Sequence, residues 1–430
     1  MYKNMLHQRF LLIFFIIFNI QVFGQNNFDK FFISATLRFD YNHSGDFNSE
    51  YFFPVQLKKE PFWGGTKTKL IDEFNYGEYR IMIYDSTSNE LIYSKGFSSL
   101  FYEWKTTIDA KNETKSFYET QIIPFPKQTI LLELQTRNKK DSFNISLKKY
   151  INPNSKFIIS ENPKNYNTIK LHYSGNSAEM VDIVFIPDGY TKDELKKLRD
   201  DMNRFSGYLF NSSPYKENKA QFNIWTVEAI SEESGTDLPD EEVWKNTVVN
   251  SSFSTFDSER YLMTYDIKTL RDIAANVPYD QIYIIVNSKK YGGGAIYNYY
   301  NCCSADNELS EFVFIHEFGH GFAGLADEYY DSQVSFEDFF SPDIEPWSPN
   351  LTTLKNFDTK WKNMMEINTS IPTVTDNKNY NIIGVYEGGG YVAKGVYRPF
   401  INCTMHTAIV DGFCPVCKKA ILKMIDFYAK

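Results

Sequence analysis

The chain has 430 residues, which is enough for two or three domains, and we expect two. Its net charge is -9 and only 23% of its residues are charged, which argues against nucleic acid as a partner because no basic stripe is present to neutralise phosphates. Aromatic residues make up 17% of the chain, a content that suits strand-rich packing but selects no function.

Residues 1–25 are predicted to be an export signal, with a basic start, an apolar run over residues 10–23 and a small-residue cleavage site before Gln25. The run is short for a membrane span, Asn19 and Gln21 interrupt it, and no second apolar segment follows. We therefore expect no integral membrane span in the mature protein, with a permanent anchor as the alternative. The expected location is periplasmic, cell-surface or secreted.

Residues 26–150 are predicted to form an all-β sandwich. Apolar and polar residues alternate over residues 33–41, which is typical of a half-buried strand. Several further short runs are separated by polar turns, and no segment has a convincing helical pattern. We expect a scaffold that packs against the following domain; the alternative is a module that contacts substrate or glycan through exposed aromatics such as Trp63 and Trp104.

Residues 151–168 are predicted to be a linker, because Pro, Asn and Ser accumulate there, and residues 169–430 are predicted to form an α/β catalytic domain. An apolar strand at 181–186 is followed by a helix, which begins at a capping box made by Thr191 and Glu194 and carries an apolar stripe to residue 209. Further strands are expected at 221–229 and 281–287. The alternation of strand and helix favours helices packed on a sheet.

Three glycines follow the last of these strands, at 292–294. Without side chains, Gly293 and Gly294 would let an extended peptide pair with this edge through its backbone, so both are predicted to bind substrate. A flexible loop between two elements is the alternative.

The motif His-Glu-x-x-His occupies residues 316–320. On a helix, His316 and His320 stand one turn apart on the same face and can bind one zinc ion, and Glu317 beside them can take a proton from a water that zinc has activated. The preceding residues 308–315 lack Pro and Gly, and Asp306 or Ser304 is expected to cap the helix. The motif predicts hydrolytic chemistry.

A catalytic zinc site needs a third protein ligand and one open position. Gly321 and Gly324 weaken the helix where the chain must turn back toward the metal, and two carboxylates follow. Asp327 is predicted to be the third ligand, with Glu328 as the alternative. The acidic stretch from 328 to 350 is expected to be a solvated loop.

The segment HEFGHGFAGLADEY (316–329) resembles the active site of the M64 metallopeptidases, a family named for an immunoglobulin A peptidase and related to the metzincins. Residues 384–399 and 402–417 also look like M64. The glycine of the metzincin pattern stands three residues after the second histidine, whereas Gly324 stands four after His320. The resemblance implies a metzincin-like zincin fold and Zn²⁺ as cofactor. It also implies that Met405 is the methionine of a Met-turn beneath the zinc.

Three further residues are candidates for contact with substrate. His406 follows Met405 and can touch the substrate or stabilise the developing oxyanion, and Tyr391 and Tyr397 are the other candidates. Residues 415–428 are predicted to form a terminal helix with an apolar face.

Five cysteines occur, all after residue 300, and in an exported protein they favour disulfides. Cys403 is expected to pair with Cys414 or Cys417, and Cys302 with Cys303 or elsewhere. A structural zinc bound by Cys403, His406, Cys414 and Cys417 is the alternative.

The sequence thus predicts an exported zinc-dependent endopeptidase acting on a polypeptide or glycoprotein substrate. One alternative is a zinc amidase acting on non-protein amides, because the same metal group attacks other activated carbonyls. Another is a non-catalytic surface binding protein with a structural metal. Glu317 argues against it, because a structural site needs no general base.

Overall fold

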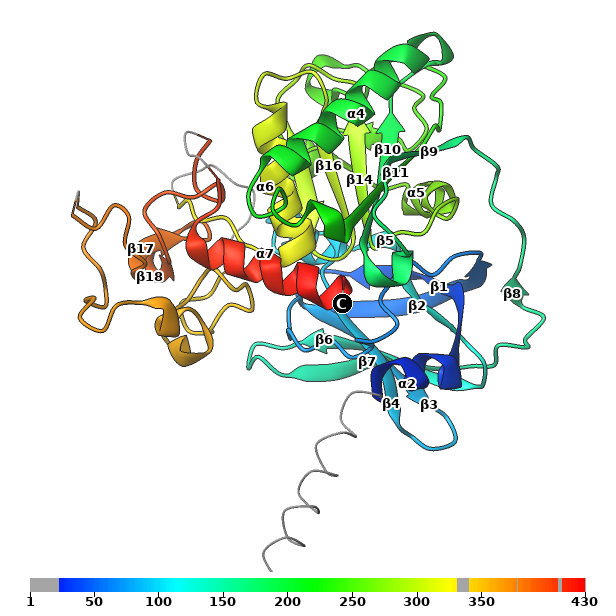
Figure 1. Cartoon of the computed structure of the whole chain (residues 1–430), viewed down its shortest axis with the longest axis horizontal. Coiled ribbons are helices and arrows are strands. Elements are labelled where there is room, and N and C mark those ends of the chain that lie inside the picture. Colours follow the sequence, from blue (N-terminus) through cyan, green and yellow to red (C-terminus); the bar gives the residue numbers. More distant parts are fainter. Residues whose placement is uncertain (1–22, 331–339, 377, 409–411, 430) are drawn as a thin grey trace, which may run out of the picture.

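The computed structural model describes residues 23–330, 340–376, 378–408 and 412–429. A strand-rich N-terminal domain comes first, and a domain built on a mixed sheet lies against it (Figure 1). The predicted export signal lies outside the described residues except for positions 23–25. Within the described part of the chain, no helix is long and apolar enough to cross a membrane.

The N-terminal domain consists of two four-stranded sheets that enclose one apolar core. The first has the order β5-β1-β2-β8 and comprises β1 (Phe32–Gly45), β2 (Glu50–Glu60), β5 (Lys115–Pro126) and β8 (Ile158–Ile159). The second has the order β4-β3-β6-β7 and comprises β3 (Tyr79–Asp85), β4 (Leu91–Phe97), β6 (Ile130–Arg137) and β7 (Phe143–Ile151). Neighbouring strands are antiparallel except for β8, which runs parallel to β2.

Several details of this domain differ from the expectation. Helices α2 (Phe23–Phe31) and α3 (Leu100–Lys105) are present where none was expected, and the segment predicted as a linker contributes β8. Trp63 and Trp104 are only 8% and 0% exposed, so contact with a glycan through these two rings is ruled out. Both pack inside the protein because their neighbours supply enough apolar surface to cover them.

From Ala35 to Tyr41 the first strand is buried on both faces, so the half-buried pattern predicted for residues 33–41 is wrong over this stretch. Arg38 and Asp40, on the polar face of β1, are 0% exposed. The guanidinium of Arg38 lies 2.8 Å from Asp40, 3.1 Å from Glu60 and 2.8 Å from Asp272. Asp272 belongs to the following domain, so the polar face of β1 meets the second domain rather than water.

The second domain is built on a six-stranded sheet of order β15-β16-β14-β10-β11-β9. Its strands are β9 (Thr168–His172), β10 (Val181–Asp188), β11 (Phe222–Val227), β14 (Gln281–Val286), β15 (Gly293–Ile296) and β16 (Tyr300–Ser304). The four central strands are parallel, and the edge strands β9 and β15 are antiparallel to their neighbours. The three apolar strands expected from the sequence are therefore present as β10, β11 and β14.

Helices cover both faces of this sheet. On one face α4 (Leu195–Asn211), α6 (Ser310–Ala323) and α7 (Pro415–Tyr428) share a core with the sheet (Figure 1). On the other face α5 (Ile267–Ala274) and residues of the N-terminal domain, including Phe101, Trp104 and Phe117, form a second core with β10 and β14. The capping box of Thr191 and Glu194 is present just before α4, and the predicted bounds of α7 are confirmed.

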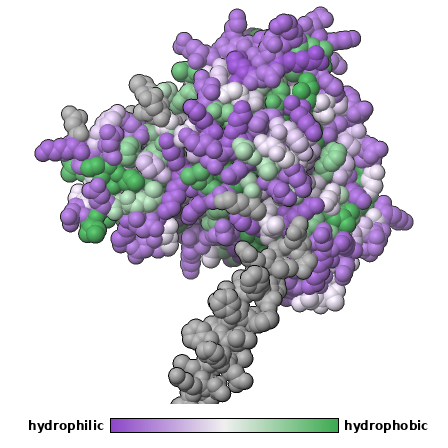
Figure 2. All heavy atoms as spheres, in the orientation of Figure 1, coloured by the Kyte–Doolittle hydropathy of each residue, from purple (hydrophilic) through white to green (hydrophobic). Residues whose placement is uncertain are grey.

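Short elements complete the chain: β12 (Ser251–Ser252) pairs with β13 (Met263–Thr264), and β17 (Tyr386–Gly389) pairs with β18 (Val392–Arg398). On the face shown in Figure 2, hydrophilic residues dominate the coloured surface and apolar residues gather in separate patches. Many Phe and Tyr side chains lie in the buried cores, although several aromatic side chains, including Phe157, Tyr150 and Trp244, are exposed.

Candidate metal centre and active-site cleft

Helix α6 carries the His-Glu-x-x-His motif. Its start has no side-chain cap, so the prediction that Asp306 or Ser304 caps it is wrong. Ser304 instead accepts a hydrogen bond through its carbonyl from the Ser310 hydroxyl at 2.7 Å, and Asn307 Oδ1 accepts one from the Leu309 amide at 3.0 Å. The Ser310 bond joins the helix to the end of β16, and the Asn307 bond lies within the turn that precedes the helix.

The helix ends at Gly324, which has a left-handed conformation with φ of 63°. Its amide donates to the His320 carbonyl at 3.0 Å, and the Leu325 amide donates to the Gly319 carbonyl at 3.2 Å. Such a turn favours glycine because a side chain would be strained there. The reversal returns the chain toward the histidines and brings Asp327 to them.

Three ligand atoms converge at this point. The Nε2 atoms of His316 and His320 lie 3.1 Å apart, and Asp327 Oδ1 lies 3.1 Å and 3.3 Å from them. Asp327 Oδ1 is buried, yet it has no hydrogen-bond partner within the described structure.

The other ring nitrogen of each histidine is held by a backbone carbonyl. His316 Nδ1 lies 2.9 Å from the Thr404 oxygen, and His320 Nδ1 lies 2.6 Å from the Leu325 oxygen. A carbonyl can only accept, so both Nδ1 atoms donate, and in the neutral rings both Nε2 atoms carry lone pairs. Metal-binding histidines are commonly oriented in this way.

These residues fit a zinc ion. Zinc bonds of about 2.0–2.1 Å in a tetrahedral site place the ligand atoms about 3.3 Å apart, and the three separations here are 3.1–3.3 Å. Two lone pairs and a carboxylate oxygen facing one another repel unless a cation lies between them. Burial opposes protonation, yet Asp327 raises the pKa of His320 to about 9, so the group attracts positive charge.

Glu317 lies beside the ligands and is half-buried. Burial raises the pKa of its carboxyl, while the two imidazoles act in the opposite direction. Its side chain packs against β15: a Cβ on Gly293 would lie 3.1 Å from Glu317 Cγ and 2.6 Å from Val313 Cγ1. Glycine at 293 therefore lets the edge strand lie close to the helix at Glu317.

Asp327 is positioned by two residues of the turn between β17 and β18. The Tyr391 hydroxyl donates to Asp327 Oδ2, and the Gly390 amide donates to the Asp327 carbonyl at 2.9 Å. With Oδ2 held by Tyr391, Oδ1 faces the histidines. Tyr391, predicted as a substrate-binding residue, thus contacts Asp327, the predicted third metal ligand.

Tyr391→Phe should weaken zinc binding by about 10–100-fold, because the hydroxyl that orients Asp327 is lost while all three ligands remain. Competition with a fluorescent zinc chelator measures the affinity. Tyr397, the other tyrosine predicted to contact substrate, lies on β18 and does not line the cleft, so that prediction is wrong and Tyr397→Phe is the matched control. Equal affinities for Tyr391→Phe and wild type would contradict this role.

The ligands open into a cleft of about 390 Å³. Both domains line it: α3 contributes Glu103, which accepts a hydrogen bond from the Tyr261 hydroxyl, and Glu78 accepts one from Trp347 Nε1 at 2.7 Å. Burial raises the pKa of Glu103 to about 8. The N-terminal domain is therefore part of the cleft wall.

The remaining predicted residues lie around the same cleft. Gly293, Gly294 and His406 line it. The amide and carbonyl of Gly293 are already bonded to Arg260 and Leu262, each at 3.2 Å, so at this residue the backbone is not open to a substrate strand. Because β15 is an ordered strand, the alternative of a flexible loop is wrong.

Met405 lies below the helix and is 0% exposed. A Cβ on Gly319 would lie 3.0 Å from its sulfur, so the methionine packs directly on the face of α6 behind the histidines. Its carbonyl accepts a hydrogen bond from the Glu328 amide at 2.8 Å. Glu328 is itself 0% exposed, so the prediction that it opens a solvated loop is wrong at this residue, and its carboxylate points to the cysteines.

The predicted disulfides are not formed: all five cysteines are buried thiols. Cys302 and Cys303 are consecutive residues of β16, so their side chains enter the cores on opposite faces of the sheet and cannot pair. Cys403, Cys414 and Cys417 lie together, but with Glu328 rather than His406. The four-residue group expected as an alternative thus has a different fourth member.

Sequence reasoning missed the contributions of Glu103 and Glu78. Nothing near them in the chain marks them, because they reach the cleft only when the two domains pack. The place of Glu328 beside the cysteines was also missed, although the sequence indicates that Glu328 points away from the histidines. Consecutive residues of an extended segment point in opposite directions, so Asp327 and Glu328 could not both face the histidines.

Comparison with known proteins places the chain in a family. The family model described as IgA peptidase M64 matches residues 169–382 and 374–425, and the model of the peptidase M64 N-terminus matches residues 27–148. No curated protein matches the chain. The matched segments contain both histidines, Glu317, Asp327 and Met405, and together they span most of the sequence. The chain therefore belongs to the IgA peptidase M64 family of peptidases.

Proposed function

We propose that the protein is an exported, zinc-dependent endopeptidase. The observation that carries this proposal is the convergence of three ligand atoms, from His316, His320 and Asp327, beside the carboxylate of Glu317 in an open cleft. Three protein ligands leave a fourth position for water or substrate, as a catalytic zinc site requires. Membership of a peptidase family supports a peptide bond as the target.

Zinc, when bound, polarises the scissile carbonyl and lowers the pKa of the attacking water. Glu317 accepts the proton of that water and passes it to the nitrogen of the leaving amine. Asp327, oriented by Tyr391, and the two carbonyl-bound imidazoles keep the ligand atoms in place. Glu103 and Tyr261 line the cleft that the peptide would occupy.

Digestion of casein by the purified protein tests the proposal. We expect fragments from internal cleavage, complete loss of cleavage with a zinc chelator, and recovery when zinc is restored. Non-protein amides of the kind found in cell walls should remain intact. Cleavage of those amides with intact casein would instead establish the amidase, and zinc binding without either reaction would establish a binding protein.

Export is tested on the mature protein. The signal predicted at residues 1–25 implies a mature N-terminus at Gln25 and recovery from the periplasm, surface or medium. Sequencing of the N-terminus of the fractionated protein measures this, and a cytoplasmic protein that starts at Met1 would contradict it.

A further inference from the structure

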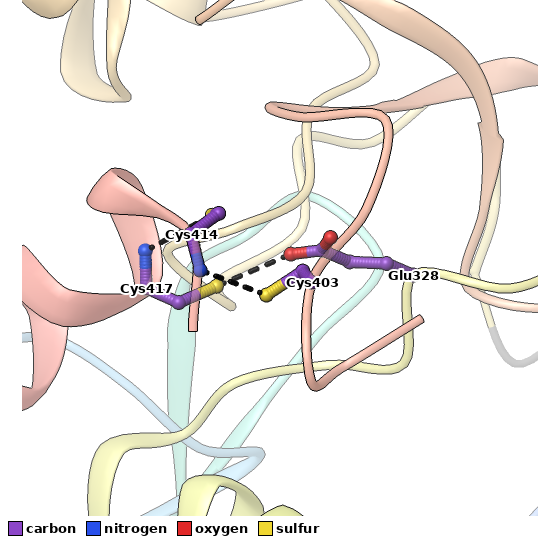
Figure 3. A group of neighbouring side chains, drawn as sticks. All are labelled: Glu328, Cys403, Cys414 and Cys417. Carbon is purple, nitrogen blue, oxygen red and sulfur yellow. Dashed lines mark hydrogen bonds between the residues drawn. The ribbon is translucent and has the colours of Figure 1, made fainter. Parts of the chain in front are cut away.

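A second group of metal-ligating side chains lies beside the first. The carboxylate of Glu328 and the thiols of Cys403, Cys414 and Cys417 have ligand atoms that all lie within 4.8 Å of one another. All four residues are buried. Figure 3 shows the Glu328 oxygens and the sulfur atoms of Cys403 and Cys417 turned toward one another. The group joins three separate segments: the turn after α6, the loop that holds Met405, and the start of α7.

The separations suit one small ion. Zinc–sulfur bonds of about 2.3 Å in a tetrahedral site place two sulfur atoms about 3.8 Å apart, which is compatible with the 4.8 Å limit of the group. Cys417 Sγ lies 3.2 Å from Glu328 Oε1. The Cys414 amide points at Cys403 Sγ at 3.2 Å, and the Cys417 amide points at Cys414 Sγ at 3.5 Å. Hydrogen bonds of this kind stabilise thiolates, which are the metal-binding form.

The group is costly without a cation. Glu328 is 0% exposed, and its Oε2 atom has no hydrogen-bond partner in the described residues. Its Oε1 atom accepts a bond from Asn350 Nδ2 at 3.0 Å, which satisfies only part of a buried carboxylate. A disulfide between two of the three cysteines would give neither the third thiol nor this carboxylate a charged partner. A metal ion gives all four side chains a partner.

We propose that Glu328, Cys403, Cys414 and Cys417 form a second, structural zinc site. Thiolates are soft ligands that select zinc over magnesium or calcium, and four protein ligands close the site to substrate. This assignment stands independently of the peptidase activity. The fourth ligand is therefore Glu328 rather than His406, the residue expected from the sequence, because His406 lines the cleft.

The second site would support the first through consecutive residues. Asp327 faces the histidines while Glu328, next in the chain, faces the cysteines. The loop after Cys403 supplies the Thr404 carbonyl that orients His316, and its Met405 carbonyl holds the Glu328 amide. Zinc bound to Cys403 and Glu328 would therefore hold both segments that position the catalytic ligands.

Metal analysis of the full chain, purified with reductant and zinc and then freed of loose metal, tests the proposal. We expect two zinc ions per chain in the wild type, one in the His316→Ala/His320→Ala variant, one in Cys417→Ser and none in the combined variant. The matched control is Cys302→Ser, which replaces a buried thiol elsewhere and should retain both ions. One zinc in the wild type that disappears entirely in the histidine variant would overturn the proposal.

Cobalt substitution of the wild-type chain gives a second readout that does not depend on how the variants fold. Cobalt bound to thiolates produces a sulfur-to-metal charge-transfer absorption, which a site of histidines and a carboxylate lacks, so we expect this band. If the band is absent and the mass of the chain without reductant is two hydrogen atoms below that of the chain with free thiols, a disulfide takes the place of the metal. Neither measurement uses proteolysis, so an inactive protein with the band would refute only the proposed function.

Discussion

Glu317→Gln should lower peptide hydrolysis by about 10²–10⁴-fold, because the proton acceptor is lost while His316, His320 and Asp327 still bind zinc. The variant keeps the size of the side chain, so its packing against β15 should survive. Initial rates on casein or a peptide substrate give kcat/KM, and metal analysis in parallel checks that zinc is retained.

The matched control for this variant is Glu311→Gln, in the first turn of the same helix and exposed to solvent. It removes one carboxylate from α6 at a residue that does not line the cleft, and it should leave the rate unchanged. A tenfold loss of rate corresponds to an increase of about 1.4 kcal/mol in the activation barrier. If Glu317→Gln kept more than about a tenth of the wild-type rate, Glu317 would not be the general base.

Arg38→Met should destabilise the folded protein by about 3–5 kcal/mol, because it leaves the buried carboxylates of Asp40 and Glu60 without the guanidinium that pairs with them. Methionine fills a similar volume, so the effect reports the lost charge rather than a cavity. The midpoint of urea denaturation measures it. Lys30→Met is the control, since the Lys30 pair with Glu90 is exposed and should contribute less than about 1 kcal/mol.

The same cluster predicts how stability depends on pH. Burial would raise the pKa of Asp272, but Lys268, Arg38 and Lys58 outweigh it and lower the pKa to about 2. An aspartate in an unfolded chain titrates near about 3.9, so this contribution is present above that pH and is lost as the pH falls toward 2. Arg38→Met should reduce that loss. An unchanged urea midpoint at neutral pH would mean that the cluster does not hold the domains together.

The features that the sequence predicted correctly are those that depend on residues close together in the chain. The His-Glu-x-x-His helix, its end at Gly324 and the terminal helix depend on spacing and on residues a few positions apart. The burial of β1 could not be predicted, because Arg38 finds Asp272 234 positions away. The place of Glu103 in the cleft wall could not be predicted for the same reason, because it depends on how the two domains pack. The disulfides were expected from the compartment and the cysteine count, and neither of these says which way the side chains point.

The core between the sheet and the N-terminal domain indicates that the second domain cannot be separated from the first without exposing apolar surface. The two family models divide the sequence between residues 148 and 169. Phe101, Trp104 and Phe117 lie on one side of that division in the chain, yet they fill the same apolar core as β10 and β14. A gene fragment that began at residue 169 would open this core to water and remove Glu103 from the cleft. The division therefore follows sequence similarity and is not a place to cut the enzyme.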